Sequence, residues 1–312
     1  MKTNLFKLRC GLVAFFVSVC AAQVNAAPFT LNNVFVSTGV GTVLEYTPTG
    51  TLVQTLTAGT GFITGSTFDS AGNLYVTRFS NNAVQKFNSA GVDQGTFGSG
   101  YSTPESIVRD ASGSFYVGSV GGGIRKFDSA GTFQSSSIGT TRIDFMDLSA
   151  DQNTMLYTQE LGEVRRVNVS TGLALSDFST AVENAFALRI LPNGNVLVAD
   201  GADIELLDAT GAQIGTYDNV AAGTWFALNL DPNGTSFWSA DASGFIAHFD
   251  ISSGALLNSF NVSGTNGTFG LSLYGEVTEG GGPNVGTVPE PGSLALVGLG
   301  LLATTIARRR RL

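Results

Sequence analysis

Five stretches of the chain repeat at an almost constant interval, and this repeat limits the possible folds more than any other feature. The first residues of their turns are 69, 110, 151, 191 and 231, so the spacings are 41, 41, 40 and 40 residues. A period of about 40–45 residues is typical of the blades of a β-propeller. The copies are FDSAGNLYVT (68–77), RDASGSFYVG (109–118), ADQNTMLYT (150–158), ILPNGNVLVAD (190–200) and LDPNGTSFWSAD (230–241), with a partial copy NNVFVST (32–38).

Each repeat predicts four strands. Glycines between the strands supply the positive φ that tight turns need, and the neighbouring Asp or Asn bonds its own backbone there. Apolar and polar residues alternate within the runs, as in half-buried strands. In one copy the expected strands are FALRIL (186–191), NVLVAD (195–200), DIELLD (203–208) and QIGTYD (213–218).

The two ends of the repeat region are incomplete in complementary ways. The N-terminal copy supplies a second, third and fourth strand but lacks a first, whereas FGLSLYGEV (269–277) resembles a first strand with nothing after it. We therefore predict an all-β fold over residues 27–278, a six-bladed β-propeller of four-stranded blades. Pairing of the C-terminal inner strand with the N-terminal strands would close the ring. The six innermost strands are expected near 63–68, 104–109, 144–150, 185–190, 225–230 and 268–273.

The blade pattern resembles NHL repeats, most closely in GSTFDSAGNLYVTRFSNNAVQKFNSAGV (65–92) and ESIVRDASGSFYVGSVGGGIRKFDSAGTF (105–133). The resemblance covers roughly residues 32–277. It implies a protein-binding platform, since NHL propellers are mainly interaction modules, with some lyase and lactonase relatives.

The N-terminus has the three parts of a secretory signal peptide. Lys2, Lys7 and Arg9 precede an apolar run at 11–22, and Val24-Asn25-Ala26 forms a small-residue cleavage site. We predict that residues 1–26 are a signal peptide whose apolar part is a terminal helix. Both cysteines lie within it, so the exported chain would have no disulfide.

The C-terminus combines a short motif, an apolar run and a basic cluster. The run 293–307 would span about 22 Å as a helix, short of the ~30 Å membrane core. The order resembles the PEP-CTERM sorting signal, here over residues 288–312, after a Gly/Pro linker at 279–287. The residues that carry the resemblance are Val288, Pro289, Glu290, Pro291, Arg308, Arg309, Arg310 and Arg311.

This resemblance implies a route for the protein. An exosortase, a membrane protease-transferase, would process the tail while the short transmembrane helix holds the precursor transiently at the inner membrane. The processed protein would then be at the cell surface or extracellular. Such proteins often accompany exopolysaccharide and biofilm production.

The charge of the central region argues against one class of partner. Residues 27–307 carry nine Lys and Arg against all 24 Asp and Glu of the chain, a formal net charge of −15. A body this acidic repels nucleic acid and anionic lipid. We therefore expect no nucleic-acid partner.

Polar residues on the innermost strands are candidates for a ligand site in the channel. Asp147, Arg189 and Asn229 give the channel most of its chemical character and fall on consecutive blades. One hypothesis is that they bind a polar ligand such as a sugar or a carboxylate. The alternative is that Asp147 and Arg189 form a partly buried ion pair that only fills the channel.

A second ring of candidates lies at the ends of the second strands. Glu160, Asp200 and Asp241 are acids on consecutive blades, and Ca²⁺ takes several oxygen ligands. A Ca²⁺ ion is therefore the one cofactor considered. The alternative is that these acids cap the turns that follow them.

The sequence offers little for catalysis. It has one histidine, His248, which excludes His-rich zinc sites and leaves little scope for a Ser-His-Asp triad. We assign no catalytic residue. We expect a non-catalytic module that binds a polysaccharide or protein of the envelope or biofilm matrix. The alternative is a metal-dependent, lactonase-like hydrolase or lyase acting in the channel.

Overall fold

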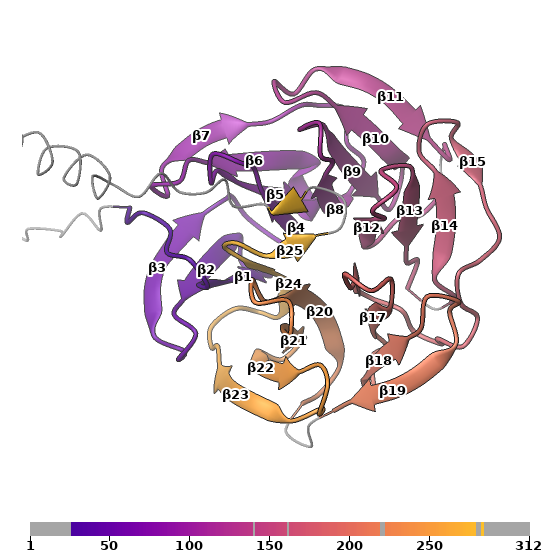
Figure 1. Cartoon of the computed structure of the whole chain (residues 1–312). Coiled ribbons are helices and arrows are strands. Elements are labelled where there is room, and N and C mark those ends of the chain that lie inside the picture. The colour runs from indigo at the N-terminus through magenta and orange to yellow at the C-terminus, as the bar shows by residue number, and fades with distance from the viewer. Residues whose placement is uncertain (1–25, 140, 161, 219–221, 279–281, 284–312) are drawn as a thin grey trace, which may run out of the picture.

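The described part of the chain forms six four-stranded antiparallel sheets arranged in a ring (Figure 1). The computed structural model describes residues 26–139, 141–160, 162–218, 222–278 and 282–283. The prediction of a six-bladed β-propeller is confirmed. The expected terminal helices lie outside the described residues.

The first three blades are given from the axis outward. Blade one contains β24 (Thr268–Leu273), β1 (Val34–Thr38), β2 (Thr42–Tyr46) and β3 (Leu52–Thr57). Blade two contains β4 (Ile63–Phe68), β5 (Leu74–Arg78), β6 (Ala83–Phe87) and β7 (Asp93–Thr96), with the 3₁₀ turn η1 (Phe79–Asn81) after β5. Blade three contains β8 (Pro104–Arg109), β9 (Phe115–Ser119), β10 (Gly123–Phe127) and β11 (Phe133–Ser137).

The other three blades follow the same order. Blade four contains β12 (Met146–Leu148), β13 (Thr154–Tyr157), β14 (Arg165–Asn168) and β15 (Leu173–Ala174). Blade five contains β16 (Leu188–Ile190), β17 (Val196–Ala199), β18 (Ile204–Leu207) and β19 (Gln213–Tyr217). Blade six contains β20 (Trp225–Leu230), β21 (Ser236–Asp241), β22 (Phe245–Asp250) and β23 (Leu256–Asn261).

Strands from the two ends of the chain close the ring in blade one. β1 pairs with β24 in antiparallel register, with Val34 opposite Leu273 and Val36 opposite Leu271. The predicted closure is confirmed. Closure of this kind makes the last inner strand part of the first blade, so neither end of the ring has an exposed inner edge.

The repeated turn after each innermost strand has the expected chemistry. In blade two, Asp69 Oδ1 accepts hydrogen bonds from the backbone N–H groups of Ala71 and Asn73, each at 2.9 Å. Gly72 of the same turn has φ +77°, a left-handed conformation that glycine adopts without steric cost. The Asp and the Gly of the repeat therefore fix where one strand ends and the next begins.

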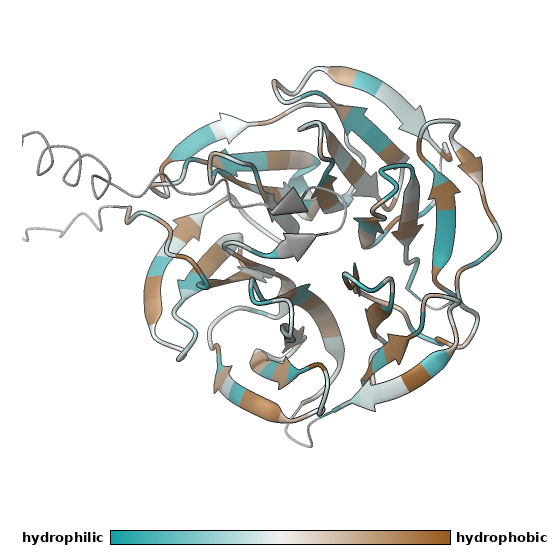
Figure 2. Ribbon diagram, in the orientation of Figure 1, coloured by the Kyte–Doolittle hydropathy of each residue, from teal (hydrophilic) through white to brown (hydrophobic). Residues whose placement is uncertain are grey.

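Apolar side chains fill the spaces between neighbouring blades. Six buried clusters occur among the described residues, each lying mainly between two adjacent blades. Trp225 and Trp238 are the largest fully buried side chains of the described residues, so both belong to the core. Along the outer strands, hydrophobic and hydrophilic residues alternate (Figure 2). The ring is therefore stabilised mainly by apolar burial between blades.

Every innermost strand has one extra residue near its start. In blades three, six and one, Glu105, Phe226 and Phe269 are skipped in the strand register. In blade five, the backbone N–H of Phe186 donates to Ala199 O, and the N–H of Ala199 donates to Ala187 O. Two residues of the inner strand, Phe186 and Ala187, therefore pair with the single residue Ala199. A β-bulge of this kind turns a side chain out of the regular pattern. β12 and β16 begin at residues 146 and 188, later than the predicted 144 and 185.

The chain leaves the ring on the side where the innermost strands end. We call this side the exit face, and the side where the innermost strands begin the mouth face. After β24 the chain turns through Glu276 into the short pair β25 (Val277–Thr278) and β26 (Gly282–Pro283). In Figure 1, β25 lies near the middle of the ring. The rest of the linker predicted at 279–287 lies outside the described residues.

Candidate functional site: the channel and its mouth

The three predicted channel residues lie together inside the propeller. Asp147 is on β12, Arg189 on β16 and Asn229 on β20, with exposed fractions of 1%, 6% and 0%. Their blades are consecutive, so the periodicity placed them correctly relative to one another.

Their polar atoms are bound by one another and by the backbone. Arg189 Nε donates to Asn229 Oδ1 at 2.9 Å, and the Asn229 amide donates to Leu271 O at 3.2 Å. Asp147 Oδ2 accepts from Ile190 N–H at 2.9 Å. Among the ion pairs of the described residues, none joins Asp147 to Arg189. These contacts hold the side chains in place and leave them little capacity for a ligand.

Glu276 is a fourth polar residue of the channel that the sequence analysis missed. It follows the last inner strand, where the repeat has no counterpart, so periodicity could not indicate it. Its carboxylate accepts a hydrogen bond from the Asn229 amide, and only 1% of the residue is exposed. Burial raises the pKa of Glu276 to about 7; the Arg189 charge opposes the shift and the Asp147 charge adds to it. Glu276 therefore extends the hydrogen-bond network of Asp147, Arg189 and Asn229 toward the exit face.

Little empty space remains inside the channel. A cavity of about 10 Å³ lies between Ser66, Ser106, Met146 and Arg189. A cavity of about 10–15 Å³ holds at most a single water. This cavity is too small for a sugar ring, so the larger pocket at the mouth is the candidate site.

The pH dependence of stability should report the state of Glu276. Because its folded pKa is raised, its contribution to stability is fully present below the unfolded value of 4.5 and is lost as pH rises through about 7. At about 1.4 kcal/mol per pKa unit, the loss is about 3 kcal/mol.

Urea unfolding at about pH 4.5 and about pH 8 tests this expectation. Glu276→Gln should be more stable than the unmodified chain at the higher pH and nearly equal to it at the lower. Equal stability of the two proteins at both pH values would contradict a buried, protonated Glu276.

The mouth face has a pocket at the entrance to the channel. Its volume is about 260 Å³, and its lining is Phe62, Thr64, Phe79, Glu105, Arg142, Glu160, Phe226 and Phe269. Glu105, Phe226 and Phe269 are bulged residues of their inner strands, which explains why a regular strand pattern did not place them here. A larger groove of about 450 Å³ lies between blades four and five, lined mainly by residues near their turns and away from the channel axis.

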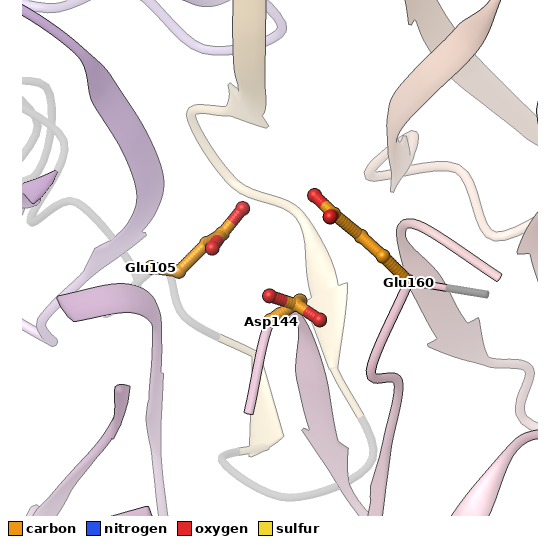
Figure 3. A group of neighbouring side chains, drawn as sticks. All are labelled: Glu105, Asp144 and Glu160. Carbon is orange, nitrogen blue, oxygen red and sulfur yellow. The ribbon is translucent and has the colours of Figure 1, made fainter. Parts of the chain in front are cut away.

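Three acidic side chains meet at one side of this mouth. One carboxylate oxygen from each of Glu105, Asp144 and Glu160 lies within 4.8 Å of the others. Figure 3 shows the three side chains converging from separate segments of the chain. Arg142 binds two of them: its Nε lies 2.8 Å from both oxygens of Asp144, and its Nη2 contacts Glu160. The guanidinium thus neutralises part of the group.

Burial and mutual repulsion favour the neutral form of two of these acids. The pKa of Glu105 is well above its usual range because the side chain is buried and because Asp144 is close. Burial and then the Asp144 charge also raise the pKa of Glu160. The mouth therefore carries less negative charge than its three carboxyl groups suggest, and a protonated Glu105 would be a hydrogen-bond donor there.

The acids predicted to share a metal ion do not lie in one group. Glu160 lies with Glu105 and Asp144, whereas Asp200 lies with Asp203 and Glu205. Asp241 instead caps its turn. Its carboxylate accepts hydrogen bonds from backbone N–H groups, including those of Gly223 and Gly244. The alternative considered for this ring, the capping of turns, thus describes Asp241. The Asp200 carboxylate likewise accepts hydrogen bonds from the backbone N–H groups of Glu183 and Asn184.

Comparison with known proteins identifies the C-terminus. The PEP-CTERM protein-sorting motif matches residues 287–311, which include the predicted Val-Pro-Glu-Pro and all four arginines. The match implies export and processing by an exosortase. The tail lies outside the described residues, as does the predicted signal peptide; within the described part, no helix is long and apolar enough to cross a membrane.

The whole chain has no match among curated proteins. Its fold is similar to a chain in the crystal structure of a nidogen/laminin complex, with TM-score 0.66 and 13% identity, covering 78% of this chain and 98% of that one. A protein of unknown function from Bacteroides caccae has TM-score 0.64 and 14% identity, with coverage of 78% and 98%. The computationally designed protein Ika8 has TM-score 0.50 and 17% identity, with coverage of 81% and 80%.

At such identities these similarities show the fold alone, and the NHL resemblance stays a prediction from the sequence. The C-terminal match and the six sheets together identify the chain as a six-bladed β-propeller with a PEP-CTERM protein-sorting motif.

Proposed function

We propose that this chain is an exported, non-catalytic propeller that binds a sugar unit of an envelope or matrix polysaccharide at its channel mouth. The observation that carries the proposal is the composition of the mouth pocket. One side is aromatic, with Phe62, Phe79, Phe226 and Phe269, and the other side carries Glu105, Glu160 and Arg142.

The aromatic side suits the apolar face of a sugar ring. Phe269 contacts both Phe62 and Phe226, with ring centroids 4.8 Å and 5.4 Å apart. Phe62 is 40% exposed, although an exposed aromatic ring gains free energy when another group covers it. Sugar C–H groups pack against such rings, while hydroxyl groups donate hydrogen bonds to carboxylates.

The charge of the protein and the size of the mouth pocket limit which sugars could bind. The region 27–307 has a formal net charge of −15, so it repels uronic acids and other anionic sugars. The pocket volume of about 260 Å³ is just below the about 300–1,000 Å³ of sites for drug-sized ligands. A single neutral or amino sugar ring, presented by a longer polymer, fits these limits.

The alternative of a metal-dependent hydrolase or lyase requires a cation at the acidic side of the mouth. Arg142 already stands there and binds Asp144 with two hydrogen bonds. A guanidinium in that place competes with a metal ion for the same oxygens. We therefore favour binding over catalysis.

Calorimetric titration with neutral, amino and uronic oligosaccharides tests the proposal. Phe62→Ala should weaken binding of a neutral or amino sugar about tenfold, equal to about 1.4 kcal/mol. Phe133→Ala is the matched control, because Phe133 is also exposed but lies on β11, where it stacks on Arg125. An equal loss in both variants, or binding of uronic sugars alone, would reject the mouth as the sugar site.

A further inference from the structure

A second acidic group lies in blade five, outside the mouth pocket. Asp200 follows β17, Asp203 precedes β18, and Glu205 lies within β18. One carboxylate oxygen from each lies within 4.8 Å of the other two. Asp200 and Glu205 are 9% and 7% exposed, so the group is mostly shielded from water.

Acids dominate the electrostatic surroundings of this group. Two further acids, Glu183 and Asp218, are close enough to act electrostatically on the group. Among the ion pairs of the described residues, none includes Asp200, Asp203 or Glu205. The mouth group has Arg142 as its cation, and here no such side chain is described.

Glu205 contributes a buried oxygen that lacks a partner. Within the described part of the chain, its Oε2 has less than 1 Å² of exposed surface and accepts no hydrogen bond from a donor group. The side chain that the Glu205 carboxyl group meets is Asp200, which is itself an acid. A buried acceptor without a partner costs about 1–3 kcal/mol, and more if it is charged. Such an atom in a group of acids points to a positively charged ligand.

Blade two has different side chains at the positions equivalent to Asp200 and Glu205. Gln85 in blade two is equivalent to Glu205 in blade five, because each is opposite a valine of the second strand, Val76 or Val198. Arg78 and Asp200 are also equivalent, because each lies two residues after that valine. In blade two, Arg78 Nη1 donates to Gln85 Oε1 at 3.2 Å. A cation and an amide thus occupy the positions that hold two acids in blade five.

We propose that Asp200, Asp203 and Glu205 bind a divalent cation of the Ca²⁺ type. Their donor atoms are all carboxylate oxygens, which hard cations prefer, and three carboxylates with added waters match the six to eight ligands of Ca²⁺. The ion would supply the positive charge that Arg78 supplies in blade two. The site is separate from the mouth pocket, and the proposal does not depend on sugar binding.

Tb³⁺ and Ca²⁺ are the probes for this site in the full chain, purified in detergent. Trp225 N–H donates to Gly201 O at 2.8 Å, so a tryptophan lies beside the residue that follows Asp200. Tryptophan-sensitised Tb³⁺ emission should appear and should be displaced by Ca²⁺. At about 1 mM Ca²⁺, a site with a Kd near about 10 μM should raise the Tm by about 5–10 °C.

One variant at the site and one control variant show where the ion binds. Glu205→Gln keeps the shape of the side chain and should abolish both the emission and the Tm shift. Without metal, it should melt at or above the temperature of the unmodified chain, because it removes a repelled acid. Glu163→Gln is the control and should keep the full response, since Glu163 pairs with Arg165 in blade four.

The remaining outcomes overturn the proposal. No Tm shift in the unmodified chain, or an undiminished shift in Glu205→Gln, would exclude this site. Loss of the response in Glu105→Gln alone would place the ion at the mouth instead. If Glu205→Gln fails to fold, Asp203→Asn takes its place, because Asp203 is only partly buried. This substitution should weaken binding of the ion at least about tenfold.

Discussion

Replacing Arg189 with Met is expected to lower the free energy of unfolding by about 3–5 kcal/mol. Arg189 is the positive charge that acts on both Asp147 and Glu276, and all three side chains are almost fully buried. Its loss leaves two buried acids without this cation and removes one of the two donors to Asn229 Oδ1, the other being the Leu230 backbone N–H. Urea unfolding at neutral pH measures the change.

The triple variant Arg189→Met, Asp147→Asn, Glu276→Gln is the control for this prediction. It removes the acids together with the cation, so most of the lost stability should return. A loss below about 1 kcal/mol in the single variant would mean that the channel network is only filler.

A chain that ends at residue 267 should lose cooperative unfolding altogether. This truncation removes β24, whose Leu271 and Leu273 pair with Val36 and Val34. Blade one would lack its innermost strand, and the apolar layers on both of its sides would open to water. Near-ultraviolet circular dichroism during thermal unfolding should show no sharp transition.

A chain that ends at residue 283 is the matched control, because it keeps β24 and also lacks the sorting tail. Adding a peptide of residues 268–283 to the shorter chain should restore the transition, since the strand needs no covalent link to pair. A sharp transition in the shorter chain alone would mean that the ring does not depend on the closing strand.

Periodicity predicted the ring well because each blade repeats the same turn chemistry. A turn that contains Asp, Asn or Gly recurs at almost constant spacing, so the number of blades and the closing strand could be predicted. The bulges could not be predicted, because one extra residue at the same place in every blade leaves the spacing unchanged. The mouth residues Glu105, Phe226 and Phe269 were missed for this reason.

The acids at the ends of the second strands show a different limit. Equal positions in consecutive blades suggested that Glu160, Asp200 and Asp241 converge. The second strand lies about 4.8 Å further from the axis than the first, which widens the ring. Nearby partners then decide where each acid lies: Asp241 turns to its own loop, and Glu160 turns to Arg142.

The chain leaves the propeller on the face opposite the mouth pocket. The last described residues, in β26, follow the inner strand that ends on the exit face, whereas the pocket with Phe62 and Glu105 lies on the mouth face. If the protein is attached through its C-terminus, the exit face would lie toward the attachment surface and the mouth pocket would face the surrounding medium. A polymer from outside would then reach the phenylalanines without passing around the ring.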